Sequence, residues 1–186
     1  MKTQLGFAGL TCLMILGLMP AEARADFEVS LGFNFNQTTY EPGSYSWTRR
    51  WGASIGYEFL DRSQLEFSFQ DIMDRTKIVS YEDTTFHDRV YSFNWVQSLA
   101  PRTFPIQPYV KAGIGQLNRD AQGTYASGAA PAKTVDAVTA IVGAGLRVYI
   151  TRAFALRAEA TSYLEGGNVR TWKDNISAQF GVSVYF

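Results

Sequence analysis

The clearest pattern in the chain is a strict alternation of apolar and polar positions over its last twelve residues. Every second residue of this segment is apolar: Ile176, Ala178, Phe180, Val182, Val184 and Phe186. The residues between them, from Asn175 to Tyr185, are polar, small or amphipathic. Because successive side chains of a β-strand point to opposite faces, the segment is predicted to be a strand with one apolar and one polar face. A membrane-embedded barrel needs strands of this kind, since lipid-facing and lumen-facing positions alternate.

Seven earlier segments show the same alternation, interrupted by turn residues such as Pro42-Gly43. The predicted strands are about Phe27–Tyr40, Trp47–Leu60, Leu65–Val79, Tyr91–Val96, Gln107–Gly115, Val138–Ile150 and Phe154–Tyr163. The sequence therefore predicts an all-β fold, an eight-stranded antiparallel up-and-down transmembrane β-barrel. Closing the sheet removes the unpaired edges that lipid would not tolerate.

The connections are predicted to alternate between two ends of the barrel. Short turns at Asp61–Ser63, Ala100–Ile106 and Thr151–Ala153 would face the periplasm with both termini. Loops at Tyr81–Asp83 and Gln122–Lys133 and a hairpin at Gly166–Asn168 would lie outside the cell. The charged segment Asp71–Val79 is expected to carry its strand beyond the membrane.

The first 25 residues read as a cleaved secretory signal peptide. Lys2 precedes a short apolar core, and Ala23-Arg24-Ala25 supplies a small-x-small cleavage site. Two domains follow from this boundary: a signal peptide over residues 1–25 and an outer-membrane barrel over residues 26–186. The only cysteine, Cys12, lies in the signal peptide, so no disulfide framework is expected in the mature chain.

The composition of the mature chain excludes several other classes of protein. Subtracting Lys2, Arg24 and Glu22 from 17 basic and 17 acidic residues leaves 15 and 16, a net charge of about −1. A nucleic-acid partner is therefore not expected. After residue 25 no run of about 18 apolar residues occurs, which argues against a helical membrane protein.

The segment Gln107-Pro108-Tyr109-Val110-Lys111-Ala112-Gly113-Ile114-Gly115 resembles the P-Y-V-x-x-G-x-G phrase of small outer-membrane barrels of the OmpA/OmpX-like type. The later stretches Val142–Leu146 and Leu156–Ala160 are similar to the two strands that follow it in that family. The resemblance implies the fold and an integral outer-membrane location. It also implies that the terminal Tyr185 and Phe186 act as the signal by which the barrel-assembly machinery recognises the chain.

Charged residues fall on the inward positions of the predicted strands. They are Glu28, Glu58, Glu66, Lys111, Arg147, Arg157 and Glu159. An eight-stranded barrel is just wide enough for side chains to fill it, and buried charges must be paired. We expect a polar network that fills the lumen; a narrow, gated polar channel for small solutes is the alternative.

Two sets of residues are expected to meet the membrane. The aromatic residues Trp47, Trp51, Tyr57, Tyr91, Trp95 and Trp172 fit interfacial girdles. The cations Arg49, Arg50, Arg170 and Lys173 fall near the predicted outer rim, where they could contact lipopolysaccharide phosphates.

Catalytic and metal chemistry receive little support from the sequence. His87 is the only histidine, and His87-Asp88-Arg89 does not match the His-x-Ser pattern of lipid-A deacylases. The carboxylates Asp71, Asp74, Glu82, Asp83 and Asp88 are interpreted as a solvated rim, with a weakly held cation as the alternative. Neither Gly113-x-Gly115 nor Gly143-x-Gly145 opens a helix, so no dinucleotide site is expected.

The sequence thus favours a non-enzymatic barrel without cofactor or metal, acting structurally or through its extracellular loops. The expected partners are outer-membrane lipid and lipopolysaccharide, the barrel-assembly machinery and an extracellular partner at the loops, and the barrel is expected to be a monomer. A porin-like channel and a lipid-A-modifying enzyme are the alternatives.

Overall fold

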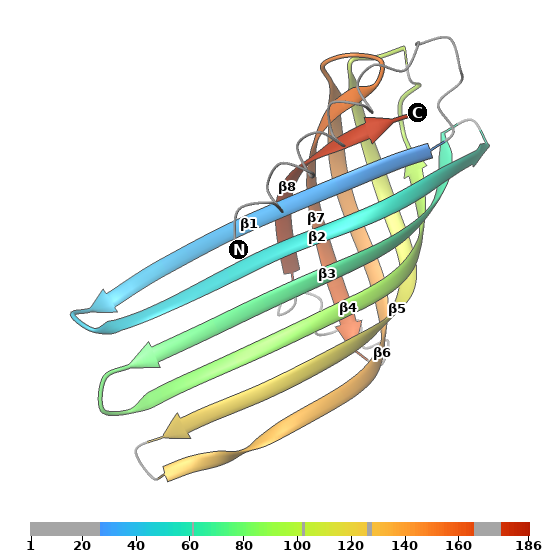
Figure 1. Ribbon diagram of the computed structural model, residues 1–186. Coiled ribbons are helices and arrows are strands. Elements are labelled where there is room, and N and C mark those ends of the chain that lie inside the picture. Colours follow the sequence, from blue (N-terminus) through green and yellow to red (C-terminus); the bar gives the residue numbers. More distant parts are fainter. Residues whose placement is uncertain (1–26, 61, 102, 126–127, 166–175) are drawn as a thin grey trace, which may run out of the picture.

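A computed structural model describes residues 27–60, 62–101, 103–125, 128–165 and 176–186 of the chain, and it contains eight antiparallel strands (Figure 1). The strands are β1 (Phe27–Glu41), β2 (Ser44–Leu60), β3 (Ser63–Ile78), β4 (Glu82–Ser98), β5 (Ile106–Tyr125), β6 (Gly128–Tyr149), β7 (Phe154–Glu165) and β8 (Ile176–Tyr185). Each strand pairs with its sequence neighbours, and β8 pairs with β1, which closes the barrel. The predicted fold is therefore confirmed.

The two ends of the described chain meet at one end of the barrel. Phe27 and Phe186 exchange two backbone hydrogen bonds, of 3.2 and 3.1 Å. We call this end the terminal end, and the opposite end, which carries the β1–β2, β3–β4 and β5–β6 hairpins, the hairpin end. Across the described ranges, the structure contains no helix of the length and apolarity that crossing a bilayer demands.

The strands differ in length in a way that shapes the hairpin end. A strand tilted by about 45° spans a bilayer with roughly 9–11 residues. At 12 and 10 residues, β7 and β8 are close to this length, whereas β5 has 20 residues and β6 has 22. Figure 1 shows β1 to β6 reaching in one direction well past β7 and β8. We call this part of β1–β6 the projecting sheet.

Two connections predicted as loops belong to this sheet. Glu82 and Asp83 open β4, and the expected loop over Gln122–Lys133 is instead the end of β5 and the start of β6. The loop prediction was wrong because small residues such as Ala and Gly were interpreted as a linker, although their backbones pair along the ladder from Ala121 to Tyr125. The connection predicted over Ala100–Ile106 is present with the same length of seven residues, shifted by one position, because β4 ends at Ser98 and β5 begins at Ile106. The hairpin predicted at Gly166–Asn168 lies outside the described residues.

Alternation along each strand separates the inside from the outside of the barrel. Inward positions are mostly polar and buried, and outward positions carry exposed aromatic and aliphatic residues such as Phe33, Ile55 and Phe93. At one inward position a glycine is required by its neighbour. A Cβ on Gly145 would lie 2.3 Å from the ring of Tyr109, its partner across β5 and β6. Gly145 thus makes room for the buried ring of Tyr109.

Candidate functional site

Six charged side chains meet inside the terminal half of the barrel. They are Glu28, Glu66, Lys111, Arg147, Arg157 and Glu159, each no more than 6% exposed. With three acids and three bases, the set carries no net charge. We call it the interior ionic network. It contains every charge predicted for the lumen except Glu58, which accepts a hydrogen bond from the backbone of Arg62 at the terminal end.

The network is connected by short contacts between strands far apart in sequence. Lys111 Nζ lies 2.6 Å from Glu159 Oε1 and 3.1 Å from Glu66 Oε1. Arg147 donates to Glu28 over 2.7 Å, and Arg157 contacts Glu66 over 2.7 Å as well as Glu159. Because each acid touches at least two bases or additional donors, the cost of burying these charges is offset by pairing.

Neutral residues that the sequence analysis did not single out complete the network. The Tyr109 hydroxyl donates to Glu159 and accepts from Arg157, both at 2.7 Å. The guanidinium of Arg147 lies 4.7 Å from the centre of the same ring. Gln64 donates to Glu28 over 2.8 Å. Tyr109 and Gln64 occupy inward positions in the alternating pattern, which could have suggested that they line the interior. Their hydrogen-bond partners, however, depend on the register between strands.

An apolar layer lies next to the network on the side of the hairpin end. It is formed by five buried residues: Ile72, Val90, Leu117, Ile141 and Tyr163. A cavity of about 20 Å³ lies beside the network and is lined by Gly32, Gly52 and Gly181 among others. Such a volume is enough for a water molecule, not for a continuous water path.

Beyond the apolar layer the interior becomes polar again. A cavity of about 80 Å³ is lined there by Arg50, Asp74, Asp88 and Arg119 together with apolar residues of the layer. Arg119 and Asp88 form a bidentate pair, with distances of 2.8 and 2.7 Å. The interior therefore consists of two polar regions separated by an apolar one.

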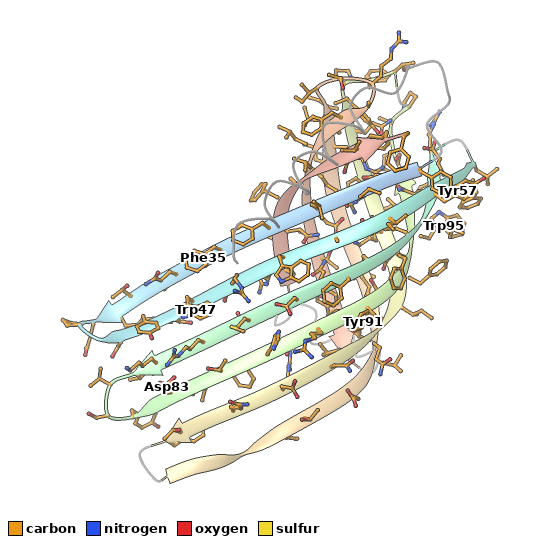
Figure 2. The ribbon with its side chains drawn as sticks, in the orientation of Figure 1. Phe35, Trp47, Tyr57, Asp83, Tyr91 and Trp95 are labelled. Carbon is orange, nitrogen blue, oxygen red and sulfur yellow. The ribbon has the colours of Figure 1, made fainter. Side chains whose placement is uncertain are left out.

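On the outer wall, aromatic residues occur in groups at different heights. Near the terminal end, Phe27 packs against Tyr57 and Phe59 against Trp95. Further along the strands, Phe69 packs between Trp51 and Tyr91, with ring centres 5.2 and 5.0 Å apart. These three form the upper aromatic group. Figure 2 shows Tyr57 and Trp95 near one end of the long strands, Tyr91 further along, and Phe35 and Trp47 towards the hairpin end.

These positions bear on the predicted girdle. Five of its members are described: Trp51, Tyr57, Tyr91 and Trp95 point outward and are exposed, and Trp47 is half-buried and stacks on Phe35. Trp172 lies outside the described residues. The assignment of these rings to the membrane interfaces stays a prediction.

A cluster of polar residues on the outer wall directly follows the upper aromatic group. Asp71 is paired in register with Trp51 on β2 and with Arg89 on β4, and Met73 is paired with Arg49 and His87. His87 Nε2 lies 2.7 Å from Asp71 Oδ2, while Arg49 and Arg89 approach the same carboxylate only to 3.8 and 4.0 Å. We call Arg49, Asp71, His87 and Arg89 the outer cationic cluster.

One step further out, the same wall carries a self-contained ion pair. Arg75 donates two hydrogen bonds to Asp83, of 3.1 and 3.0 Å. This hydrogen bonding by Arg75 lowers the pKa of the exposed Asp83 carboxyl. The pair belongs to the projecting sheet, where the stick for Asp83 is labelled in Figure 2.

The cations predicted to contact lipopolysaccharide do not share one surface. Arg49 points outward, whereas the adjacent Arg50 lines the interior cavity. Grouping them was wrong, because neighbouring residues of a strand face opposite sides. Arg170 and Lys173 lie outside the described residues.

The predicted rim of carboxylates is also divided between the two faces. Asp71 and Asp83 point outward and contact His87 and Arg75, while Asp74 and Asp88 line the interior cavity. Within the described ranges, no group of three or more histidines, cysteines or acids comes together in a way that could hold a metal ion.

The two residues predicted to form the assembly signal have different surroundings. Tyr185 is buried and its ring lies 5.3 Å from that of Tyr149, whereas Phe186 is exposed and pairs with Phe27 through its backbone. Their recognition by an assembly machinery stays a prediction.

A closed eight-stranded barrel with an apolar outer wall and a charged interior defines the class of integral outer-membrane β-barrels. The family described as outer membrane protein beta-barrel domain matches residues 8–186, and the chain belongs to this family.

Solved structures of the same class resemble the fold. The N-terminal barrel of Pseudomonas aeruginosa OprF aligns with a TM-score of 0.57 and 20% identity, over 86% of this chain and 97% of that one. Yersinia pestis Ail, the attachment invasion locus protein, aligns with a TM-score of 0.56 and 14% identity, over 88% and 100%. Neisserial surface protein A aligns with a TM-score of 0.53 and 13% identity, over 89% and 100%. At these identities the likeness is one of fold. No curated protein sequence matches the chain.

Proposed function

We propose that this chain is a non-enzymatic outer-membrane barrel with a closed lumen, which acts through the surface of its projecting sheet. The terminal end faces the periplasm and the hairpin end faces outward. The observation that carries the proposal is the combination of a filled interior with strands much longer than a bilayer requires. The described interior offers a solute no continuous path, and much of the described chain beyond the membrane is exposed sheet.

The closed lumen is supported by the order of the interior layers. A permeating ion would have to break the contacts of Lys111 and Arg157 with Glu66 and Glu159, and then cross the apolar layer around Ile141. Removing one partner of a buried ion pair typically costs about 3–5 kcal/mol, so thermal fluctuations open such a path rarely.

The surface role is supported by the edges and the length of the projecting sheet. Among the described residues, β1 pairs with β8 from Glu28 to Phe33, although β1 continues to Glu41. In the same ranges, β6 begins at Gly128 and its pairing with β7 begins at Thr139. Two of the similar structures, Ail and Neisserial surface protein A, are named for attachment or for the cell surface. These names favour the same class of role here.

The non-enzymatic part of the proposal is supported by the surroundings of His87. Its ring nitrogens contact Asp71 at 2.7 Å and Arg89 at 3.5 Å. Neither partner is a serine, threonine or cysteine, and a hydrolase of acyl esters that uses a histidine base needs such a hydroxyl or thiol within hydrogen-bond reach of it.

The lumen is tested by single-channel recording of the purified protein in planar bilayers. We expect no reproducible conductance steps, either from the native protein or from a variant in which Ala121–Lys133 is replaced by a two-residue Asn-Gly turn. Reproducible steps from the native protein would favour the narrow channel instead. Heat-modifiable migration on gels verifies that each sample is folded.

The surface role is tested with the same trimmed variant. Cells displaying the native or the trimmed chain are compared for attachment to immobilised extracellular-matrix proteins and for aggregation with each other. We expect both activities to fall when the β5–β6 hairpin is shortened. Equal attachment and aggregation by both cell types would contradict a role for the projecting sheet.

A further inference from the structure

The outer cationic cluster contains more positive than negative side chains, so its cations are not all neutralised within the cluster. Asp71 is the only acid among its four members, and its close contact is with His87 at 2.7 Å. The guanidinium groups of Arg49 and Arg89 remain 3.8 and 4.0 Å from the carboxylate, beyond the usual length of a charge-assisted hydrogen bond. Both arginines therefore have donors left for another acceptor.

The exposure of the side chains shows where that acceptor would have to come from. The side chains of Arg49 and Arg89 are 44% and 47% exposed on the outer wall, whereas that of Asp71 is 11% exposed beneath them. In addition, Nε of Arg49 is shielded from solvent and has no hydrogen-bond partner. An acceptor can approach only from outside the barrel, over the buried carboxylate.

The position of the cluster along the barrel axis determines whether it lies in the membrane or at the membrane–water interface. Trp51 and Tyr91 belong to the upper aromatic group, and each is two residues from one of the cluster arginines on its own strand. Aromatic residues at the border of the apolar wall mark the membrane–water interface. With these rings at the interface, as the sequence predicts, the arginines reach the level of the lipid headgroups on the side of the hairpin end.

We propose that the outer cationic cluster binds a phosphate group of an outer-leaflet lipid between Arg49 and Arg89. Guanidinium groups recognise phosphate through paired, charge-assisted hydrogen bonds, and two of them from different strands can hold one phosphate from both sides. Asp71 and His87 lie beneath the two arginines, where the Asp71 carboxylate competes with phosphate for them. The acyl chains of the same lipid lie against the aromatic and aliphatic wall. This inference rests on the proposed outward orientation of the hairpin end.

The Arg75–Asp83 pair provides a matched control on the same wall. Arg75 lies on β3 within the same outward face, but both of its contacting nitrogens are already used by one carboxylate. Replacing Arg75 therefore removes the same charge without removing a free phosphate ligand. If the wall attracted anions only through its overall charge, replacing Arg49, Arg75 or Arg89 would weaken binding equally. A defined phosphate site would be weakened only by replacing Arg49 or Arg89.

The test measures binding of lipid A carrying both phosphates to the detergent-purified protein by native mass spectrometry. The Arg49→Gln and Arg89→Gln variants are expected to bind at least about tenfold more weakly, as for the loss of charge-assisted hydrogen bonds. Arg75→Gln is expected to bind as the native protein does. Lipid A without phosphates should bind weakly to all forms.

A fourth variant distinguishes a phosphate site from a purely structural ion cluster. Asp71→Asn retains the shape of the side chain but removes the negative charge that competes with phosphate, so its binding of lipid A should be tighter. If the four residues formed only a structural ion cluster, Asp71→Asn would weaken the binding of lipid A as much as the loss of an arginine does. Heat-modifiable migration shows whether each variant is folded.

Three results would overturn the proposal. They are equal binding of phosphorylated and dephosphorylated lipid A, equal weakening by Arg75→Gln, and displacement of lipid A by inorganic phosphate at comparable concentrations. The last would assign the site to free phosphate rather than to lipid. None of them depends on channel conductance, so a failure of this inference is distinguishable from a failure of the closed-lumen proposal.

Discussion

The interior ionic network and the outer cationic cluster are built from the same types of residue but are organised in opposite ways. Inside, acids and bases are equal in number, and Lys111 lies 2.6 Å from Glu159 in surroundings without solvent access. Outside, one carboxylate faces two arginines that remain at 3.8 and 4.0 Å. A structural network and a candidate binding site therefore differ less in how many charges they contain than in whether each charge already has a close partner.

The largest expected effect comes from breaking the interior network at Lys111. Lys111→Met leaves Glu66 and Glu159 with one base fewer in a buried site, so the free energy of unfolding should fall by about 3–5 kcal/mol. Urea unfolding of the protein in lipid bilayers measures this change. Binding of lipid A to the folded fraction should remain native.

A second substitution restores neutrality and tests the explanation. In Lys111→Met with Glu66→Gln, the network again has equal numbers of acids and bases, and part of the lost stability should return. Because the two residues touch, their effects should not add. Strictly additive losses would show that net charge does not govern the network.

A smaller effect is expected from opening the apolar layer. Ile141→Ala removes a side chain that is 1% exposed and should lower the free energy of unfolding by about 3 kcal/mol, within the range for buried Ile-to-Ala changes. The neighbouring Val142→Ala is a matched control, because Val142 faces outward and should cost much less. If both variants lose the same stability, the apolar layer is not a packed core.

The smallest effect is expected at the Arg75–Asp83 pair. The lowered pKa of Asp83 means that the pair contributes stability above the unfolded-state pKa of the carboxyl and loses it as the pH falls through the folded-state value. Because both side chains are exposed, Arg75→Gln should leave the urea midpoint almost unchanged at pH 7, and any difference should disappear at strongly acidic pH. A loss as large as that of Lys111→Met would contradict the contrast between saturated surface pairs and buried networks.

The sequence was sufficient to predict the barrel and the inward charges, because both depend only on a period of two. Glu28, Arg147 and Arg157 could be assigned to the interior from their own strands alone. The same rule also separates Arg49 from Arg50, although the two were grouped by their proximity in sequence.

The outer cationic cluster could not be predicted in this way. It requires the register that places Asp71 beside Arg89 and Met73 beside His87, and the register depends on where the β3–β4 hairpin turns. The turn was predicted at Tyr81–Asp83, but Glu82 and Asp83 already belong to β4. The partners of Tyr109 and Gln64 were missed for the same reason, since contacts between strands distant in sequence follow from barrel closure.

The seam between β1 and β8 has a consequence for how the barrel is completed. Among the described residues it consists of six paired positions, from Glu28 with Tyr185 to Phe33 with Phe180, and the hydrogen bonds between Phe27 and Phe186, whereas β3 and β4 share sixteen pairs. Joining the first strand to the last also closes the longest loop of the chain, so this seam has the largest entropic cost and the fewest hydrogen bonds to offset it. Amide protons of Leu31 and Val182 should therefore exchange with solvent deuterium before those of the β3–β4 ladder. The barrel should therefore open most easily between β1 and β8, and these two strands should be the last to pair during biogenesis.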